Sequence, residues 1–240
     1  MTEHGGPAGG RGRGVVEGAF AVLEALRRTG EEAGVTELAE ACGVPKGSVH
    51  RLLDQLVAVG AVERWGSRYR VGPELYRIGQ AWQPHPGLRA AARLPSHRLR
   101  AATGASVVVT VLHEDLALTV ASVPGAGEVL VPVRNGAGFP LETAAGRALC
   151  GPRGDGPTWD RGGLVPGVSC VALPVRTAGA RLPVAAVAAV LPERAVSGAG
   201  EGAGGAERVV RAVAEAAAAV ARGLARPVRE PTGLPRGLLR

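Results

Sequence analysis

The sequence predicts an α+β protein of two domains, a small helical domain that ends in a two-stranded hairpin and a larger domain of strands and helices. Apolar residues with helical spacing occur at residues 49–57, directly before a hairpin pattern. Two prolines and a glycine then interrupt the next helical pattern at residues 83–87, QPHPG. After Gly104 the apolar period changes from helical to extended. We therefore expect the domain boundary at residues 83–87.

The first predicted helix runs from Val15 to Arg28. Its larger apolar side chains are expected to mark the side that faces the core of the domain, and these are Val16, Phe20, Leu23 and Leu26. The Gly-rich residues 1–14 before it cannot bury apolar surface, so we expect a disordered tail there, whose Arg11 and Arg13 could enter a DNA minor groove as an arm.

A short helix, a tight turn and a longer helix follow within residues 35–60. Gly43 stands in the turn, where a helix-turn-helix needs a positive φ, and Pro45 is expected at the first position of the longer helix. Gly60 is expected to cap its end. The apolar stripe of the longer helix consists of Val49, Leu52, Leu53, Leu56 and Val57. The opposite face carries Lys46, Gly47, His50, Arg51 and Asp54, so it is hydrogen-bonding and basic at its start.

A hairpin is predicted from residues 61–65 and 68–71, joined by Gly66-Ser67, whose leading glycine suits a type II′ turn. Arg68 and Arg70 would share one strand face and Tyr69 and Val71 the other. This order predicts a winged helix-turn-helix, whose helix reads base edges while the hairpin grips phosphate. We expect the DNA contacts at Lys46, Gly47, Ser48, His50, Arg51, Arg64, Arg68 and Arg70. An ordinary three-helix core with a solvated arginine face is the alternative, which the order and spacing disfavour.

Two stretches of the chain resemble the isocitrate lyase regulator (IclR) family of bacterial transcription factors. GVPKGSVHRLLDQLVAVGAVER followed by YRVGPELYRIG is similar to the family's N-terminal domain, and FPLETAAGRALCG and GVSCVALPV resemble its two ligand-pocket segments. The resemblance implies a winged helix-turn-helix at 15–72, a linker helix at 73–87 that supports dimerisation, and a GAF-like effector-binding domain at 88–226. It also implies double-stranded DNA with a roughly palindromic operator, a small-molecule effector, and a homodimer or dimer of dimers as the working species. Residues 227–240 are expected to form a second disordered tail.

The second domain is expected to pack its helices against one face of a sheet. A helix from Leu88 to about Ala102 would be kinked or broken near Leu94 by Pro95. The remaining elements are expected to be strands at 106–112, 116–123, 129–134, 168–175 and 184–190, and helices at 141–150 and 207–225.

The resemblance also implies which residues line the effector pocket, namely Val131, Phe139, Ala144, Ala145, Asp160, Cys170, Ala188 and Val190. Family members that bind small carboxylates carry hydroxyl side chains where this chain has Ala188 and Val190. Because unpaired polar groups on a buried ligand are unfavourable, a less polar effector is favoured. Only residues 151–167 separate the two pocket segments, which shortens the domain relative to the family. A second domain that only dimerises, without an effector, therefore stays an alternative, as does an inert thiol at Cys170 and a surface acid at Asp160.

Composition excludes several classes of protein. The net charge of +7 lies outside the helix-turn-helix, because residues 1–82 contain 10 basic and 10 acidic residues and the rest of the chain contains 18 and 11. Three cysteines without CxxC spacing and five scattered histidines predict neither a disulfide framework nor a metal site, and no cofactor is expected. The apolar run 184–191 is too short to span a bilayer, so a cytoplasmic protein, bound to DNA in the nucleoid, is expected.

Two further motifs have chemical precedents, but their sequence context disfavours both. Residues 200–205 match GxGxxG, but no second strand follows to complete a dinucleotide-binding unit, so a flexible glycine linker is expected. An enzyme that uses Cys150 or Cys170 as nucleophile would need a base, and His113 stands in a predicted hairpin turn. We therefore expect no catalytic residues.

Overall fold

A computed structural model of the protein describes residues 14–30, 32–125, 131, 133–151, 156–197 and 202–225. The chain forms two compact units that divide between Trp82 and Gln83. The tails expected to be disordered lie outside the described residues, apart from Gly14.

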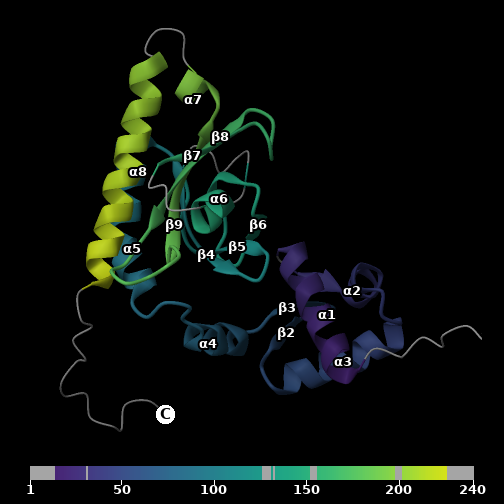
Figure 1. The fold of residues 1–240 in the computed structure, drawn as a ribbon. Coiled ribbons are helices and arrows are strands. Elements are labelled where there is room, and N and C mark those ends of the chain that lie inside the picture. The colour runs from purple at the N-terminus through teal and green to yellow at the C-terminus, as the bar shows by residue number, and fades with distance from the viewer. Residues whose placement is uncertain are drawn as a thin grey trace, which may run out of the picture. The chain divides into compact units, whose positions relative to one another are not determined.

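The first unit packs three helices against a small sheet (Figure 1). The sheet has the order β1-β3-β2, and its strand β1 was not predicted. A further helix, α4, follows the sheet. The elements are α1 (Val15–Thr29), β1 (Ala33–Gly34), α2 (Val35–Cys42), α3 (Lys46–Ala58), β2 (Val62–Trp65), β3 (Arg68–Val71) and α4 (Pro73–Ala81).

The predicted apolar stripe of α3 is confirmed, since Val49, Leu52 and Leu53 are buried and Leu56 and Val57 pack against the same core. Gly43 ends α2 with φ +64°. Beyond α3, Gly60 has φ +73°. Two hydrogen bonds close the end of α3, from the Gly60 amide to Val57 and from the Ala61 amide to Leu56, which is a Schellman motif. The predicted position of Pro45 was wrong by one residue, because it is the N-cap of α3.

The predicted core side of α1 was right for Leu26, which is buried, and for Leu23, which packs against the same core, but wrong for Val16 and Phe20, which are exposed. The helix also buries Gly18, Val22 and Ala25. Leu52 of α3 lies so close that a Cβ on Gly18 would come within 3.1 Å of its Cδ1. The absence of a side chain at Gly18 lets α3 approach α1 closely. Close packing between the two helices, rather than the size of the apolar side chains, therefore decides which face of α1 is buried.

The hairpin is confirmed, with Trp65 paired to Arg68 across a two-residue loop. Gly66 has φ +62°, whereas the φ of Ser67 is not positive. This combination fits the predicted type II′ turn. Tyr69 is buried against the helices, whereas Val71 on the same strand face is exposed. After the hairpin, α4 buries none of its residues within this unit.

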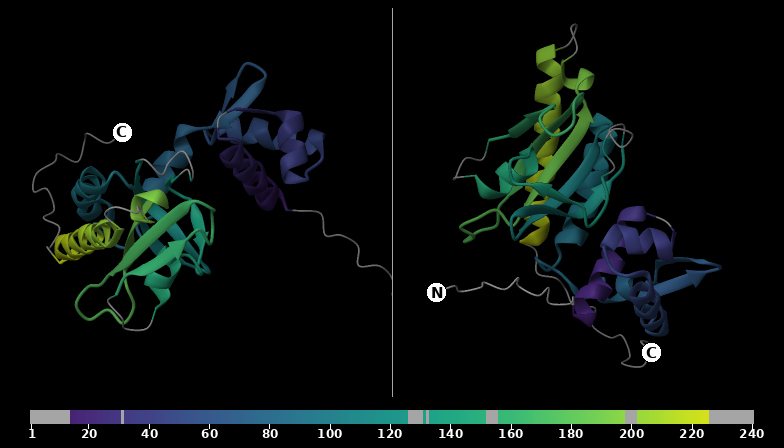
Figure 2. Two further views of the ribbon diagram at one scale, coloured as in Figure 1. Left: turned by 90° about the horizontal axis from the view of Figure 1, so that it is seen from above. Right: turned by 90° about the vertical axis from the view of Figure 1, so that its right-hand side faces the viewer.

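The second unit is a six-stranded sheet with the order β6-β5-β4-β9-β8-β7, antiparallel throughout. Helices α5 and α8 pack on one face, and the short α6 packs on the other (Figures 1 and 2). The prediction of helices on only one face was therefore wrong for α6. The elements are α5 (Leu88–Thr103), β4 (Ser106–His113), β5 (Leu116–Val123), β6 (Gly138–Pro140), α6 (Ala144–Cys150), β7 (Thr158–Arg161), β8 (Val168–Val175), β9 (Ala185–Pro192), α7 (Arg194–Ser197) and α8 (Gly202–Leu224).

Two further predictions for this unit were wrong, and two elements were missed. A strand was expected at 129–134, but its described residues 131, 133 and 134 do not pair with any strand. The strand that pairs with β5 at this edge is β6. The strand β7 and the helix α7 were not predicted. Residues 202–205 of the GxGxxG segment belong to α8, so they are not a flexible linker, while Gly200 and Glu201 lie outside the described residues.

Helix α5 runs through Pro95 without the expected break. Its residues Leu88, Ala92 and Leu99 share one core with α8. The two helices approach so closely that a Cβ on Gly223 would lie 2.8 Å from the Cβ of Ala91. This packing on both sides of Pro95 compensates for the hydrogen bond that proline cannot donate. Among the described residues, no helix is both long enough and apolar enough to cross a membrane.

The stripe of α3 gives a stability prediction. Leu53→Ala removes a fully buried side chain and should lower the free energy of unfolding of the first unit by about 2–5 kcal/mol. Val59→Ala, which removes an exposed side chain of the same region, should change it by less than about 0.5 kcal/mol. Denaturant titration followed by circular dichroism measures both, and equal effects of the two substitutions would contradict the packing described here.

Candidate nucleic-acid interface and ligand pocket

The face of α3 opposite the buried stripe carries polar side chains. Lys46, Gly47, His50 and Arg51 are exposed, and Ser48 is half-buried. His50 Nδ1 lies 3.0 Å from Asp54 Oδ2, one turn further along the helix. Arg51 Nη2 lies 3.5 Å from Ser48 Oγ, which is a weak contact. The structure therefore leaves the two cations at the start of the helix, Lys46 and Arg51, accessible to a ligand.

The arginines of the hairpin are held by acidic and aromatic neighbours. Arg68 donates to Glu37 at 2.9 Å and to the carbonyl of Glu32 at 2.8 Å, while Arg70 donates to Glu63 at 2.8 Å. Arg70 also lies over the Trp65 ring, with Cζ 4.7 Å from the centroid. Arg64, on the other strand face, donates to the Gly66 carbonyl. The predicted basic strand face is thus partly neutralised in the free protein.

Glu37 is the acid that holds Arg68. The Gly34 amide, 2.8 Å away, and the Arg68 guanidinium lower the pKa of this carboxyl group. The pair is exposed, and exposed ion pairs contribute little to stability, so a phosphate oxygen can replace the carboxylate at little loss. The ion pairs therefore hold the hairpin arginines in place without preventing them from binding a phosphate.

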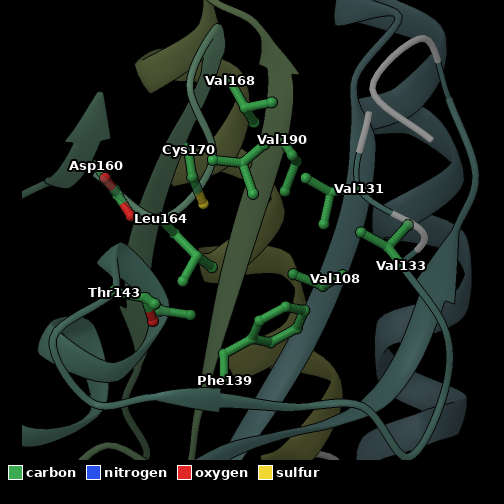
Figure 3. A pocket seen from close by; sticks show the side chains of 12 residues that line it. Val108, Val131, Val133, Phe139, Thr143, Asp160, Leu164, Val168, Cys170 and Val190 are labelled. Atoms are coloured by element: carbon green, nitrogen blue, oxygen red, sulfur yellow. The ribbon is translucent and has the colours of Figure 1, made fainter. Parts of the chain in front are cut away.

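The second unit contains a pocket between the sheet and the segments around α6 (Figure 3). Its cavity of about 50 Å³ has room for only a few water molecules. Figure 3 shows Asp160, Leu164 and Thr143 on one side, with Val131 and Val133 on the opposite side. The lining residues are Val108, Val131, Val133, Phe139, Thr143, Ala145, Asp160, Leu164, Val165, Val168, Cys170 and Val190.

Strand register explains why distant residues meet in this pocket. Asp160 of β7 is the cross-strand partner of Cys170 in β8, and Cys170 is the partner of Val190 in β9. Directly paired residues point to the same face of a sheet with Cβ atoms about 4.5–5.5 Å apart. One row across three strands therefore forms a wall of the pocket.

The polar groups of the pocket are few. Thr143 caps α6, since its hydroxyl donates to the Pro140 carbonyl at 2.7 Å and accepts from the Gly146 amide at 3.3 Å. Asp160 Oδ1 accepts from the Gly163 amide at 3.0 Å. Burial raises the pKa of the Cys170 thiol to about 12, with a further contribution from the Asp160 carboxylate, while Arg147 acts in the opposite direction. At neutral pH this thiol is uncharged.

Six of the eight residues expected in the pocket line it, namely Val131, Phe139, Ala145, Asp160, Cys170 and Val190. The other two, Ala144 and Ala188, are fully buried in the core beside it and do not reach the cavity. Sequence reasoning missed Val108, Val133, Thr143, Leu164, Val165 and Val168. Thr143 had a detectable signal, because a threonine directly before a helical segment is a common N-cap. Among the described residues, no group of three or more metal-ligating side chains comes together.

The environment of Cys170 predicts its reactivity. A pKa of about 12 leaves roughly one thiolate in ten thousand or fewer at pH 7.5, and only the thiolate is nucleophilic. Iodoacetamide should therefore modify the exposed Cys150 well before Cys170, and raising the pH toward 12 should accelerate the reaction of Cys170. Peptide mass spectrometry distinguishes the two sites. Equal rates at pH 7.5 would contradict a half-buried, uncharged thiol.

The chain is similar to known proteins in its helix-turn-helix and in the fold of both units. Residues 15–65 match the IclR helix-turn-helix domain. A glycerol operon regulatory protein from Streptomyces coelicolor is 33% identical over 137 residues, which is 56% of this chain. The match covers 54% of that protein, so the chain spans about half the length of this curated relative.

Solved structures extend the likeness to the second unit. An IclR transcriptional regulator from Alicyclobacillus acidocaldarius is 26% identical, with a TM-score of 0.68 over 88% of this chain and 98% of its own. An IclR homologue from Microbacterium hydrocarbonoxydans, described as complexed with 4-hydroxybenzoate, is 18% identical, with a TM-score of 0.71 over 88% of this chain and 99% of its own. The first unit therefore contains an IclR helix-turn-helix domain, and both units share the fold of solved IclR transcriptional regulators, a winged helix-turn-helix followed by a GAF-like α+β domain.

Proposed function

We propose that this protein is a DNA-binding transcriptional regulator whose affinity for its operator is modulated by a small molecule bound in the second unit. The observation that carries the first part is the division of α3 into two faces. Its apolar stripe is buried, so Lys46, His50 and Arg51 are turned to the surface at the start of a helix that follows a helix-turn-helix turn. The hairpin arginines beside this helix are suited to contact phosphates.

The second part rests on the pocket. Its wall is mostly methyl and aromatic groups, and β9 contributes Val190 where a hydroxyl would be needed to bind a small oxygenated acid. The name of the Streptomyces coelicolor relative points to the glycerol operon, and the Microbacterium protein is described with 4-hydroxybenzoate. The lining favours an effector with an apolar body over a polyol, because buried hydroxyl groups need partners that these side chains do not supply.

The small volume of the cavity supports a second candidate, in which the GAF-like unit only dimerises. We favour a unit that binds an effector. The cross-strand row Asp160, Cys170 and Val190 and the N-cap of α6 line the same cavity. A catalytic role is not proposed, since an uncharged Cys170 is a poor nucleophile. We place the protein in the cytoplasm, at the nucleoid.

Arginine substitutions test DNA binding. Arg51→Ala should weaken operator binding by about 1–3 kcal/mol, roughly 5- to 150-fold, if Arg51 reads a base edge. Arg68→Ala should weaken binding to all sequences similarly and reduce the slope of log affinity against log salt by about 1, because it would remove one phosphate contact. Gel shift at fixed salt measures both. Arg77→Ala on α4, which removes an arginine paired with Glu74, is the matched control. Unchanged affinity in both test variants would contradict the proposed interface.

The working species is expected to be a homodimer or a dimer of dimers, because one short helix reads too few base pairs and two-fold symmetry supplies a second half-site. Exposed apolar side chains on the first unit support association, and they are Val15, Val16 and Phe20 on α1 and Tyr76 and Ile78 on α4. Light scattering at micromolar concentration should give at least twice the monomer mass. A monomer that binds a single half-site as tightly as a palindrome would refute this expectation.

A further inference from the structure

The tip of the hairpin in the first unit carries an exposed tryptophan. Trp65 is the last residue of β2, next to the Gly66-Ser67 loop, and it is 61% exposed. Figure 2 shows that the hairpin projects beyond the helices of its own unit. Single exposed apolar side chains are common on protein surfaces and need no function. The charges around this tryptophan set it apart from such a residue.

Arginines surround the indole of Trp65. The residue pairs with Arg68 across the hairpin, so the two side chains lie on the same face of the strands. The Arg70 guanidinium lies over the indole ring, with Cζ 4.7 Å from the ring centroid, and the Glu63 carboxylate holds Arg70 at 2.8 Å. The ring is therefore supported by Arg70 on one side, while more than half of the residue stays accessible.

These surroundings favour a partner that is both anionic and apolar. Residues 62–71 contain three arginines and one glutamate, a net charge of +2, which attracts an anion. A free phosphate or an acidic peptide would bind the arginines but leave the indole in water. The grooves of DNA offer deoxyribose rings and base edges between two rows of phosphates. A DNA groove therefore suits the arginines and the tryptophan together.

The length of the hairpin indicates which groove its tip reaches. Strand β2 follows α3 after residues 59–61, and its four residues span roughly 13 Å at about 3.3 Å each. The major groove, in which α3 is proposed to lie, is about 12 Å wide. The tip would therefore pass the phosphates at the border of that groove and reach the neighbouring minor groove. Arginines and apolar side chains both enter the minor groove in other DNA-binding proteins.

We propose that Trp65 packs into the minor groove beside each half-site, against deoxyribose rings and base edges. This inference rests on the proposed function, since it adds an apolar contact to the phosphate contacts of the hairpin arginines. The 2-amino group of guanine projects into the minor groove, whereas an A·T pair has no such group. The contact therefore selects against G·C pairs beneath the hairpin, so Trp65 contributes to sequence preference outside the major groove.

The test uses the full chain and the operator duplex recovered by selection from a random pool. Every pair flanking a half-site is made either G·C or inosine·C, because these two pairs share one major-groove pattern and differ in the minor groove by the 2-amino group. In gel shift, the inosine duplex should bind about fivefold more tightly or better, the lower end of what an aromatic contact to a base contributes. Equal affinity of the unsubstituted chain for the two duplexes would overturn the proposal.

Substitutions at the two ends of the hairpin test the role of Trp65 itself. Trp65→Ala should abolish the preference for the inosine duplex, whereas Trp65→Phe, which keeps an aromatic ring, should retain most of it. Val71→Ala removes an exposed apolar side chain from the other end of the hairpin and should leave the preference unchanged. A preference that survives Trp65→Ala would show that another residue reads the minor groove and would overturn the assignment.

The salt dependence separates a groove contact from a merely structural role. Trp65→Ala should lower affinity without changing the slope of log affinity against log salt, because it removes no phosphate contact. If Trp65 only held Arg70 in place, its loss would also cost the Arg70 phosphate contact, and the slope would fall by about 1. A slope reduced in this way would contradict the proposal.

Fluorescence gives a readout that does not depend on the alanine variant. The difference in emission between the unsubstituted chain and Trp65→Phe isolates Trp65 from Trp82 and Trp159. Binding of the inosine duplex should protect this emission from quenching by acrylamide. Quenching that is the same with and without DNA would count against a buried indole in the complex.

Failure of this inference can be told apart from failure of the proposed function. If selection recovers no operator, the same measurements are made on poly(dI-dC) and poly(dG-dC). A preference for poly(dI-dC) that requires Trp65 would then support the inference and contradict a sequence-reading regulator. An operator that binds equally well with and without Trp65 would leave the proposed function intact and overturn the inference.

Discussion

Burial of the α3 stripe is the constraint on which the first unit depends. Val49, Leu52 and Leu53 pack against α1 and α2, and burying each contributes roughly 1.5–3 kcal/mol. A helix turned by half a rotation would expose all three, so its orientation about its own axis is strongly determined. The same rotation decides that Lys46, His50 and Arg51 are at the surface. The chemistry of the exposed face therefore follows from the packing of the buried one.

Short sequence patterns were sufficient to predict those elements that are determined by residues close together in the chain. The α3 stripe depends on residues of one helix, and the Gly43 turn and the Gly66-Ser67 hairpin each depend on residues of one loop, and all three were predicted. The same holds for β5 and β8, which are rich in Val, Leu and Ala and were predicted with the observed bounds. The buried side of α1 was not predictable in this way, because Gly18 faces the core to admit Leu52, a residue 34 positions later. Tertiary fit outweighed local hydrophobicity there.

The ligand pocket shows the same limit. Six of its lining residues were expected through the family resemblance, but β7 was not predicted, so its pairing with β8 could not be derived from periodicity. Once β7 pairs with β8, register alone brings Asp160 next to Cys170 and into line with Val190. Ala188 lies one pleat along β9 on the same face, where α6 covers it, which explains why the expectation failed for that residue.

Selection from a random pool of duplex DNA by the full chain tests the central claim most directly. Repeated rounds should enrich one sequence with two-fold symmetry, with half-sites about one helical turn apart or a multiple of it. Arg51→Ala should relax the preference at defined positions of each half-site. A pool that stays random after repeated rounds, with binding that depends only on salt, would contradict the proposal that this face of α3 reads sequence.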